Sequence, residues 1–203
     1  MRKRLLIATR NAHKTAEFRE MLGDRFEIED LLTHPEIGEI DETGATFREN
    51  AELKALAAAH AFDGLVLADD SGLEVDALDG APGVRSARYA GENATDAMNR
   101  DKLLAELSTA GARGRQRSAR FRCVLVLAER GRVLATFDGT VEGTIINQPK
   151  GANGFGYDPL FVPEGWCETF AELTPEVKHR ESHRARALSK LCTYLEAQAS
   201  APE

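Results

Sequence analysis

Apolar residues in the first half of the chain form short continuous runs that alternate with stretches of helical spacing. Leu5–Ala8 and Leu65–Ala68 are four-residue apolar runs, and each predicts a short buried strand. Helical spacing follows the first run over Glu17–Leu22. The pattern Thr46-x-x-Glu49 is a capping box, which predicts a helix to about Phe62. Strands and helices therefore alternate in this half of the chain.

The second half has a different pattern, dominated by strands. Phe121–Ala128 predicts a strong strand, and Gly131 turns the chain into a second one, Val133–Phe137. Val141–Ile146 predicts a third strand, so that the segment forms an antiparallel meander. Before it, the turn residues of Leu73–Gly91 predict a long loop, a length that is usually functional or disordered in compact domains.

The apolar run at Leu65–Ala68 leads directly into Asp69-Asp70-Ser71-Gly72, where we expect the strand to end. Buried charge is costly without a partner, and ligands of α/β proteins bind at the carboxyl ends of strands. An ordinary turn is the alternative, because Asp, Ser and Gly dominate turns for backbone reasons. On these four residues alone the two interpretations are equally supported.

Two further segments carry polar groups next to predicted helices. The loop from Thr9 to Lys14 joins a strand to a helix, an arrangement that points backbone N–H groups at an anion. The loop lacks the glycines of a Walker motif, and in isolation an ordinary helix start is favoured. Asn50 and Lys54 lie one turn apart on the next helix, where spacing alone favours a solvated face over a cleft.

Glycines and aromatic residues gather in the segment from Pro149 to Pro159. Glycine lets a backbone approach a flat ligand closely, and the Phe155 and Tyr157 rings are candidates for stacking on a base. Further on, Ser182 is a candidate N-cap that places His183 and Arg184 in the first turn of the last helix. Cations there oppose the helix dipole, which makes sense if an anion or a base carbonyl binds against them.

Composition narrows the functional classes. The chain has 203 residues and a net charge of −7, which argues against a general nucleic-acid binder. The arginines between positions 113 and 122 form a local basic run, which we interpret as a solvated strand edge. Three scattered cysteines without a CxxC pair indicate reduced thiols, and no apolar run is long enough for a membrane span. We therefore expect a cytoplasmic protein without a stable nucleic-acid complex or membrane partner.

Acidic and basic candidates together suggest metal-assisted phosphate chemistry. Hard carboxylate oxygens suit Mg²⁺, which usually binds one or two carboxylates plus substrate phosphates. The acidic candidates are Asp41, Glu42, Asp69 and Asp70, and the cationic ones are Arg10, Lys14, Lys54, Lys178 and Arg184. A Mg²⁺-dependent nucleotide hydrolase follows from this chemistry.

Seven stretches in order resemble the inosine/xanthosine triphosphate pyrophosphatase family. They are Thr9–Lys14, Glu42–Ala51, Ala68–Gly72, Gly80–Gly83 with Ser86–Tyr89, Gly154–Pro159, Ala171–Thr174 and Ser182–Arg184. The resemblance implies hydrolysis of non-canonical purine nucleoside triphosphates (ITP, dITP, XTP) to the monophosphate and pyrophosphate, which cleanses the nucleotide pool. It also implies one domain over 1–203, a homodimer, and an α/β fold of two lobes around a long central mixed β-sheet with the active-site cleft between them.

The resemblance assigns roles to individual positions of this sequence. Asp70 becomes the general base, and Asp70 with Asp41 or Glu42 holds Mg²⁺. The triphosphate is assigned to Thr9, Arg10, Asn11, Ala12, His13 and Lys14, with Ser71 as a further substrate contact. The base pocket is assigned to Phe155, Gly156, Tyr157 and Asp158, completed by Lys178, His183 and Arg184.

Two positions depart from the family pattern, and other functions are alternatives to this assignment. Family members often carry Glu-Glu where this chain has Asp41-Glu42, which leaves open which of the two reaches the metal. Arg10 replaces a small or polar residue and adds a candidate phosphate contact. A nucleotide sensor without hydrolysis, and a pyrophosphatase for modified pyrimidine nucleotides, are alternative functions. A further alternative is an RNA- or DNA-binding protein that uses the arginines between positions 113 and 122, and the negative net charge argues against it.

Overall fold

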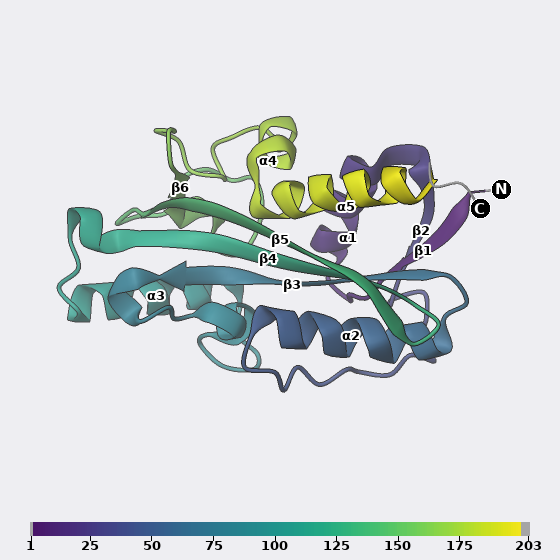
Figure 1. Cartoon of the computed structure of the whole chain (residues 1–203). Coiled ribbons are helices and arrows are strands. Elements are labelled where there is room, and N and C mark those ends of the chain that lie inside the picture. Colours follow the sequence, from purple (N-terminus) through teal and green to yellow (C-terminus); the bar gives the residue numbers. More distant parts are fainter. Residues whose placement is uncertain (1, 200–203) are drawn as a thin grey trace. The chain divides into compact units, whose positions relative to one another are not determined.

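The computed structural model describes residues 2–199 and forms one six-stranded sheet in the order β2-β1-β3-β4-β5-β6 (Figure 1). The β1–β2 and β1–β3 pairs are parallel and the β5–β6 pair is antiparallel, which makes the sheet mixed. The predicted α/β class with a mixed sheet is therefore confirmed. The strands are β1 (Lys3–Ile7), β2 (Phe26–Asp30), β3 (Leu65–Val75), β4 (Ser118–Glu129), β5 (Arg132–Ile145) and β6 (Phe161–Pro163). The helices are α1 (Ala12–Leu22), α2 (Phe47–Ala61), α3 (Asp96–Thr109), α4 (Pro175–Glu181) and α5 (His183–Ala199).

Contacts divide the chain into two compact units, each assembled from separate segments. The first unit contains residues 2–70, 123–138 and 187–199 of the described chain. The second contains residues 71–122 and 139–186. Strands β3, β4 and β5 each contribute residues to both units. None of the helices within residues 2–199 is long and apolar enough to cross a membrane.

In the first unit, helices cover both faces of the strands. Figure 1 shows α1 and α5 on one face and α2 on the other. The α1/α5 face buries alternate strand residues such as Leu65, Leu67 and Cys123 against Phe18 and Leu188. Successive side chains of a strand point to opposite faces, so the neighbouring residues Val66 and Ala68 lie on the α2 face. The same alternation sets the directions of the next two residues of β3, Asp69 and Asp70.

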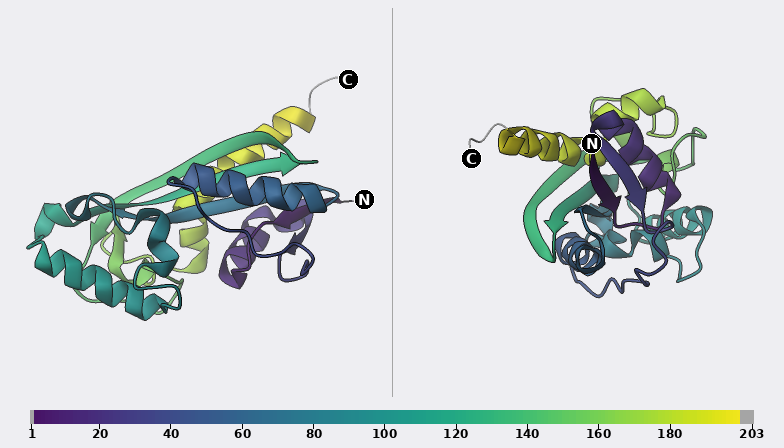
Figure 2. Two further views of the ribbon diagram at one scale, coloured as in Figure 1. Left: turned by 90° about the horizontal axis from the view of Figure 1, so that it is seen from below. Right: turned by 90° about the vertical axis from the view of Figure 1, so that its right-hand side faces the viewer.

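The α2 helix begins as its capping box predicts. The Thr46 hydroxyl accepts a hydrogen bond from Glu49 N at 3.2 Å, and the Glu49 carboxylate accepts one from Thr46 N at 3.1 Å. At its far end, the turn between β4 and β5 lies beside the helix (Figure 2), and Gly131 N donates to Ala59 O at 3.1 Å. Gly131 has a φ of +70°, and a Cβ there would lie 2.8 Å from the His60 ring. The positive φ therefore favours glycine at this turn.

Two predictions for the strands and loops are corrected. The two strands predicted over Val133–Phe137 and Val141–Ile146 are one continuous strand, β5, because no turn interrupts them. The long loop predicted over Leu73–Gly91 is largely ordered: β3 extends to Val75, and short 3-10 helices follow it. The Ser86 hydroxyl ties this segment down by accepting from Leu73 N at 2.9 Å and donating to Gly83 O at 2.6 Å.

The second unit has its own apolar core. Leu103 and Leu107 of α3 are fully buried with three phenylalanine rings from separate segments, Phe121, Phe161 and Phe170. The Phe121 and Phe161 ring centroids are 4.7 Å apart in an edge arrangement, and those of Phe161 and Phe170 are 5.3 Å apart. Aromatic packing of this kind supports the segment between β5 and β6, which carries the predicted base-pocket residues Phe155–Asp158.

Candidate active site

Asp69 and Asp70 lie inside a strand and not at its end. The prediction that the strand ends at Asp69 is wrong, since β3 continues for five residues beyond Asp70. Both carboxylates are buried, at 1% and 6% exposure. As consecutive strand residues they point to opposite faces of the sheet. Each therefore has its own set of partners.

Asp69 points to the face covered by α1. Its carboxylate pairs with the Lys14 ammonium and accepts a hydrogen bond from the Cys123 thiol at 3.2 Å. Lys14 lies in the first turn of α1, where Asn11 is the N-cap and its side chain accepts from His13 N and Lys14 N. Two of the N–H groups that the sequence offered to an anion are therefore engaged within the protein.

Asp70 points to the α2 face and shares a lysine with a second carboxylate. The Lys54 ammonium lies 3.2 Å from Asp70 Oδ1 and 2.6 Å from Glu42 Oε1, and it also donates to the Asp69 carbonyl at 2.8 Å. The solvated face favoured for Asn50 and Lys54 is wrong, because they are 0% and 9% exposed. Asn50 Oδ1 accepts from Gly44 N at 2.7 Å and thereby holds the loop that carries Glu42.

One oxygen of this cluster has no partner. Asp70 Oδ2 is buried and makes no hydrogen bond with any group in residues 2–199. Burial raises the pKa of Asp70 above its ordinary value, although Lys54 and Lys14 oppose this shift. Burial alone lowers the pKa of Lys54, but the nearby carboxylates of Asp70 and Glu42 outweigh it and the net pKa is raised. The lysine is therefore held charged beside a carboxylate that binds protons more readily than a free one.

The predicted metal ligands come together in part. Glu42 and Asp70 meet at the Lys54 ammonium, whereas Asp41 is exposed. Across residues 2–199, no group of three or more His, Cys, Asp or Glu side chains is arranged to hold a metal ion. Mg²⁺ needs only one or two carboxylates when substrate phosphates supply the remaining ligands. The unpartnered Asp70 Oδ2 and the nearby Glu42 carboxylate fit that requirement.

The remaining residues of the predicted triphosphate loop have mixed roles. Thr9 Oγ1 accepts from Asn11 N at 3.1 Å, and Ala12 and His13 are exposed. The Arg10 guanidinium donates to the Leu31 and Ile37 carbonyls at 3.0 and 2.6 Å. Arg10 therefore fixes the segment that leads toward Glu42.

In the second unit, the predicted base-binding residues form a tight turn around Asp158. Asp158 Oδ2 accepts from Phe155 N at 2.9 Å and pairs with the Lys178 ammonium at 2.7 Å. Gly154 has a φ of +73°, and a Cβ there would collide with the Asp158 carboxylate. The Lys178 ammonium also lies 4.9 Å from the centre of the Phe155 ring. The turn thus presents one aromatic ring beside a buried cation.

His183 and Arg184 lie in the first turn of α5, as the predicted N-cap at Ser182 implies. Ser182 Oγ accepts from Ala185 N at 3.2 Å. The His183 ring stacks on Phe121 with centroids 4.8 Å apart, and the Arg184 guanidinium donates to Ser71 Oγ at 3.0 Å. Arg184 is 1% exposed and its guanidinium lies 6.0 Å from the Phe155 ring centre. This group therefore brings two cationic side chains, Lys178 and Arg184, next to the Phe155 ring.

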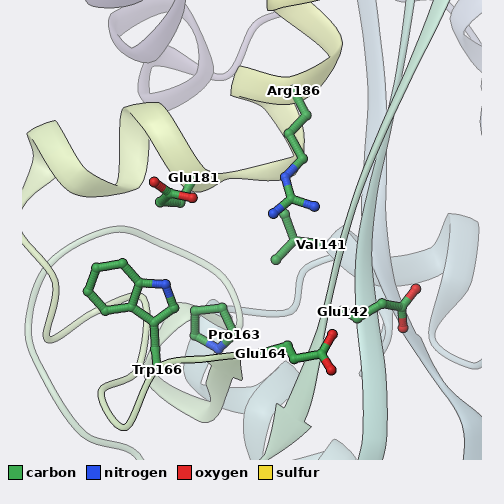
Figure 3. Close-up of a pocket in the computed structure, with 7 residues that line it drawn as sticks. All are labelled: Val141, Glu142, Pro163, Glu164, Trp166, Glu181 and Arg186. Atoms are coloured by element: carbon green, nitrogen blue, oxygen red, sulfur yellow. The ribbon is translucent and has the colours of Figure 1, made fainter.

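Two residues of these networks lie outside the predicted sites. Lys54 is a candidate cation without an assigned role; its one-turn spacing from Asn50 places both residues on one face of α2, and the structure shows that this face is buried. Nothing in the sequence indicates that Cys123 contacts Asp69, because a cysteine in an apolar strand is equally typical of a packed core. A pocket of about 130 Å³ in the second unit contains none of the predicted residues. Figure 3 shows Arg186 of α5 extending toward Val141 in that pocket.

Comparisons with known proteins agree with the sequence motifs. The model of the Ham1 family matches residues 5–194. A dITP/XTP pyrophosphatase of Halalkalibacterium halodurans is 49% identical over 195 residues, which cover 96% of this chain and 100% of that protein. The dITP/XTP pyrophosphatase of Bacillus subtilis is 48% identical over 196 residues, covering 96% and 98%.

Solved structures give the same result. The Ham1 protein of Staphylococcus aureus has a TM-score of 0.84 at 41% identity, covering 97% of this chain and 100% of that one. The HAM1 protein of Coxiella burnetii has a TM-score of 0.85 at 44% identity, covering 96% and 99%. The resemblance carried by the ordered motifs is confirmed, and the chain belongs to the Ham1 family.

Proposed function

We propose that this protein hydrolyses non-canonical purine nucleoside triphosphates, ITP, dITP and XTP, to the nucleoside monophosphate and pyrophosphate. The names of its relatives support this substrate class. The observation that carries the proposal is the buried Asp70–Lys54–Glu42 cluster, in which Asp70 Oδ2 has no partner within residues 2–199. Removal of these triphosphates would keep them out of DNA and RNA.

Asp70 acts as the general base in this proposal. Its Oδ2 accepts a proton from the water that attacks the α-phosphorus, and the raised pKa makes it a better proton acceptor than a free carboxylate. Lys54 holds Oδ1 in place and balances the charge of Glu42. The protein contributes mainly position and electrostatic stabilisation, as phosphoryl transfer requires.

Asp70 with Asp41 or Glu42 would hold Mg²⁺, which supplies charge neutralisation on the leaving pyrophosphate. The triphosphate itself is assigned to the loop from Thr9 to Lys14. Lys14 contributes a point charge there, and Asp69 fixes its ammonium.

The base is assigned to the group around Phe155 in the second unit. The aromatic ring offers a stacking surface, and Lys178, His183 and Arg184 offer hydrogen-bond donors for the 6-keto oxygen of hypoxanthine or xanthine. Adenine carries an amino group at that position, so that it leaves buried donors unpaired and binds less well. Ser71, which already accepts from Arg184, is a further substrate contact in this scheme.

Four wider properties belong to the same proposal, of which the single domain and the homodimer rest on the family resemblance. We propose that residues 1–203 act as a single catalytic domain, that the protein is a cytoplasmic homodimer, and that it forms no stable nucleic-acid complex. The net charge of −7 supports the last of these.

The test is pyrophosphate release from ITP, XTP, GTP and ATP with Mg²⁺. The proposal predicts fast release from ITP and XTP and slow release from the other two. Release of orthophosphate, or a preference for ATP or for a modified pyrimidine triphosphate, would contradict it. Omitting the metal tests the cofactor separately, because activity should return on addition of Mg²⁺.

A further inference from the structure

Two side chains of helix α3, Asp96 and Arg100, contact the base-binding turn, and neither has a role in the proposed function. Asp96 Oδ2 accepts a hydrogen bond from Gly156 N at 2.6 Å. One helical turn later, Arg100 Nη1 donates to Gly156 O at 2.7 Å. The N–H and the C=O of one glycine are therefore held from the same helix, and we call this arrangement the Gly156 clamp.

Asp96 is well placed on the helix for this contact. Thr95 is the N-cap of α3, and its hydroxyl accepts from Met98 N at 3.3 Å. Asp96 is thus the first residue of the helix, where a carboxylate is stabilised by the helix dipole. Arg100 follows at i+4 on the same side of the helix. The capped end of α3 gives the clamp a rigid base.

Gly156 is the residue at which the turn most needs restraint. Its φ is +60°, a left-handed conformation in which glycine alone pays no steric cost. On its C-terminal side, Tyr157 is anchored, since its ring is 4% exposed and its hydroxyl donates to Ser86 O at 2.9 Å. On its N-terminal side, Phe155 is only half-buried. Phe155 N donates to Asp158 Oδ2 at 2.9 Å, and the clamp adds a second restraint on the backbone that directs the Phe155 ring.

We propose that Asp96 and Arg100 are positioning residues that fix the Phe155 ring for stacking on the substrate base. This inference rests on the proposed function, because it takes Phe155 as the base-binding ring. The two residues act through the Gly156 backbone, so their loss weakens binding of the base and leaves triphosphate binding and the chemical step unchanged.

Four variants test the clamp. Arg100→Met removes one of its charged hydrogen bonds, and Asp96→Asn removes the charge from the other while keeping an acceptor. Arg100→Lys keeps a charged donor, and Asp101→Asn is the control on the exposed side of α3. We measure kcat and KM for ITP, and the inhibition constant of inorganic tripolyphosphate, which has no base. Loss of one charge-assisted hydrogen bond predicts a KM for ITP raised about tenfold.

The same variants should leave kcat and the tripolyphosphate inhibition constant within about twofold, since neither depends on the base. Arg100→Lys should recover most of the KM, and Asp101→Asn should behave as wild type. Hydrogen exchange of the Gly156 amide should accelerate about tenfold in Asp96→Asn and not in Asp101→Asn, because its acceptor is weakened.

Different outcomes would contradict the positioning role of the clamp and the proposed function. A fall in kcat with unchanged KM, or an equal loss of tripolyphosphate binding, would overturn the positioning role. If wild type releases no pyrophosphate from ITP, the proposed function fails. In that case the Gly156 amide still decides the clamp, and unchanged exchange in Asp96→Asn would reject it.

Discussion

Asp70 and Asp158 are both buried carboxylates paired with a buried lysine, yet their surroundings differ. Asp158 Oδ2 receives two donors, Phe155 N and Lys178 Nζ, at 2.9 and 2.7 Å. Asp70 Oδ1 lies 3.2 Å from a lysine that it shares with Glu42, and its Oδ2 has no partner within residues 2–199. A carboxylate that accepts two hydrogen bonds, as Asp158 does, holds a turn in shape. A carboxylate with an open oxygen and a raised pKa can take a proton.

The comparison extends to the charges around each aspartate. Around β3 in the first unit, Glu42, Asp69 and Asp70 share Lys14 and Lys54. Around the Phe155 turn in the second unit, Lys178 and Arg184 accompany the carboxylate of Asp158. The first region brings three carboxylates together, which suits a cation and a proton, and the second places two cations beside an aromatic ring, which suits the keto group of a stacked base. Chemistry and recognition are thus assigned to different groups of residues.

Replacing Asp70 should have the largest effect on activity. Asp70→Asn keeps the shape and removes the base, so kcat should fall about 10²- to 10⁴-fold, the range of general-base catalysis. The measurement is pyrophosphate release from ITP, with thermal unfolding to show that the variant is folded. Activity within threefold of wild type would remove the proposed distinction between the two aspartates.

Replacing Asp158 should affect stability and substrate affinity. Asp158→Ala leaves the Lys178 ammonium buried without this carboxylate and frees Phe155 N, which predicts a loss of about 3–5 kcal/mol in the free energy of unfolding. Urea unfolding measures this loss. The double variant Asp158→Ala/Lys178→Met is the control, and it should recover part of the stability because no unpaired charge remains. No recovery would show that the pair is not coupled.

Gly154 should tolerate no side chain, whereas Gly165 should tolerate one. Both have positive φ, at +73° and +84°, but only a Cβ on Gly154 would meet the Asp158 carboxylate. Gly165→Ala should cost about 1–2 kcal/mol for its backbone conformation alone. Gly154→Ala should cost more than that and raise the KM for ITP. Equal effects of the two variants on the KM would contradict the role of the Asp158 turn.

The Cys123 thiol should have a smaller effect through Asp69. Cys123→Ala removes the hydrogen bond to Asp69 Oδ2 and should raise the KM for ITP a few-fold, because a thiol is a weak donor worth about 1 kcal/mol or less here. Cys123→Ser keeps a donor and should restore the KM. Cys192→Ala, on α5, is the matched control and should leave the KM unchanged. Failure of serine to rescue would indicate simple loss of packing.

The smallest effect is expected for His34, which is remote from Asp70 in its contacts. Hydrogen bonds to Glu36 and Glu29, each 2.8 Å long, raise the pKa of His34. Its contribution to stability is therefore fully present below the ordinary pKa of about 6.5 and is lost as the pH rises through the raised value. His34→Gln should cost up to about 1 kcal/mol at pH 5.5 and almost nothing at pH 9. A cost that grows with pH would contradict this pairing.

Local signals in the sequence predicted local structure well. The capping box at Thr46 and the N-cap at Ser182 are confirmed, because a cap depends on residues within one helical turn. Ordered motifs identified the family and the α/β class. These features needed no knowledge of distant contacts.

Errors arose where distant segments decide the structure. The strand through Asp69 and Asp70 was expected to end because buried charge is costly, but Lys14 and Lys54 reach it from two other elements. Spacing alone favoured a solvated face for Asn50 and Lys54, but this face is buried. Spacing along the chain does not reveal that lysines and carboxylates meet on opposite faces of one strand. The Gly156 clamp could not be predicted from the sequence either, because it joins α3 to a turn that is distant along the chain.

The most direct test of the account is hydrolysis of ITP in ¹⁸O-labelled water by the wild-type protein. Water activated by Asp70 at the α-phosphorus predicts that the label enters the nucleoside monophosphate, with none in pyrophosphate. Label in pyrophosphate would place the attack at the β-phosphorus and contradict the assignment of Asp70. Label in orthophosphate would contradict pyrophosphate release itself.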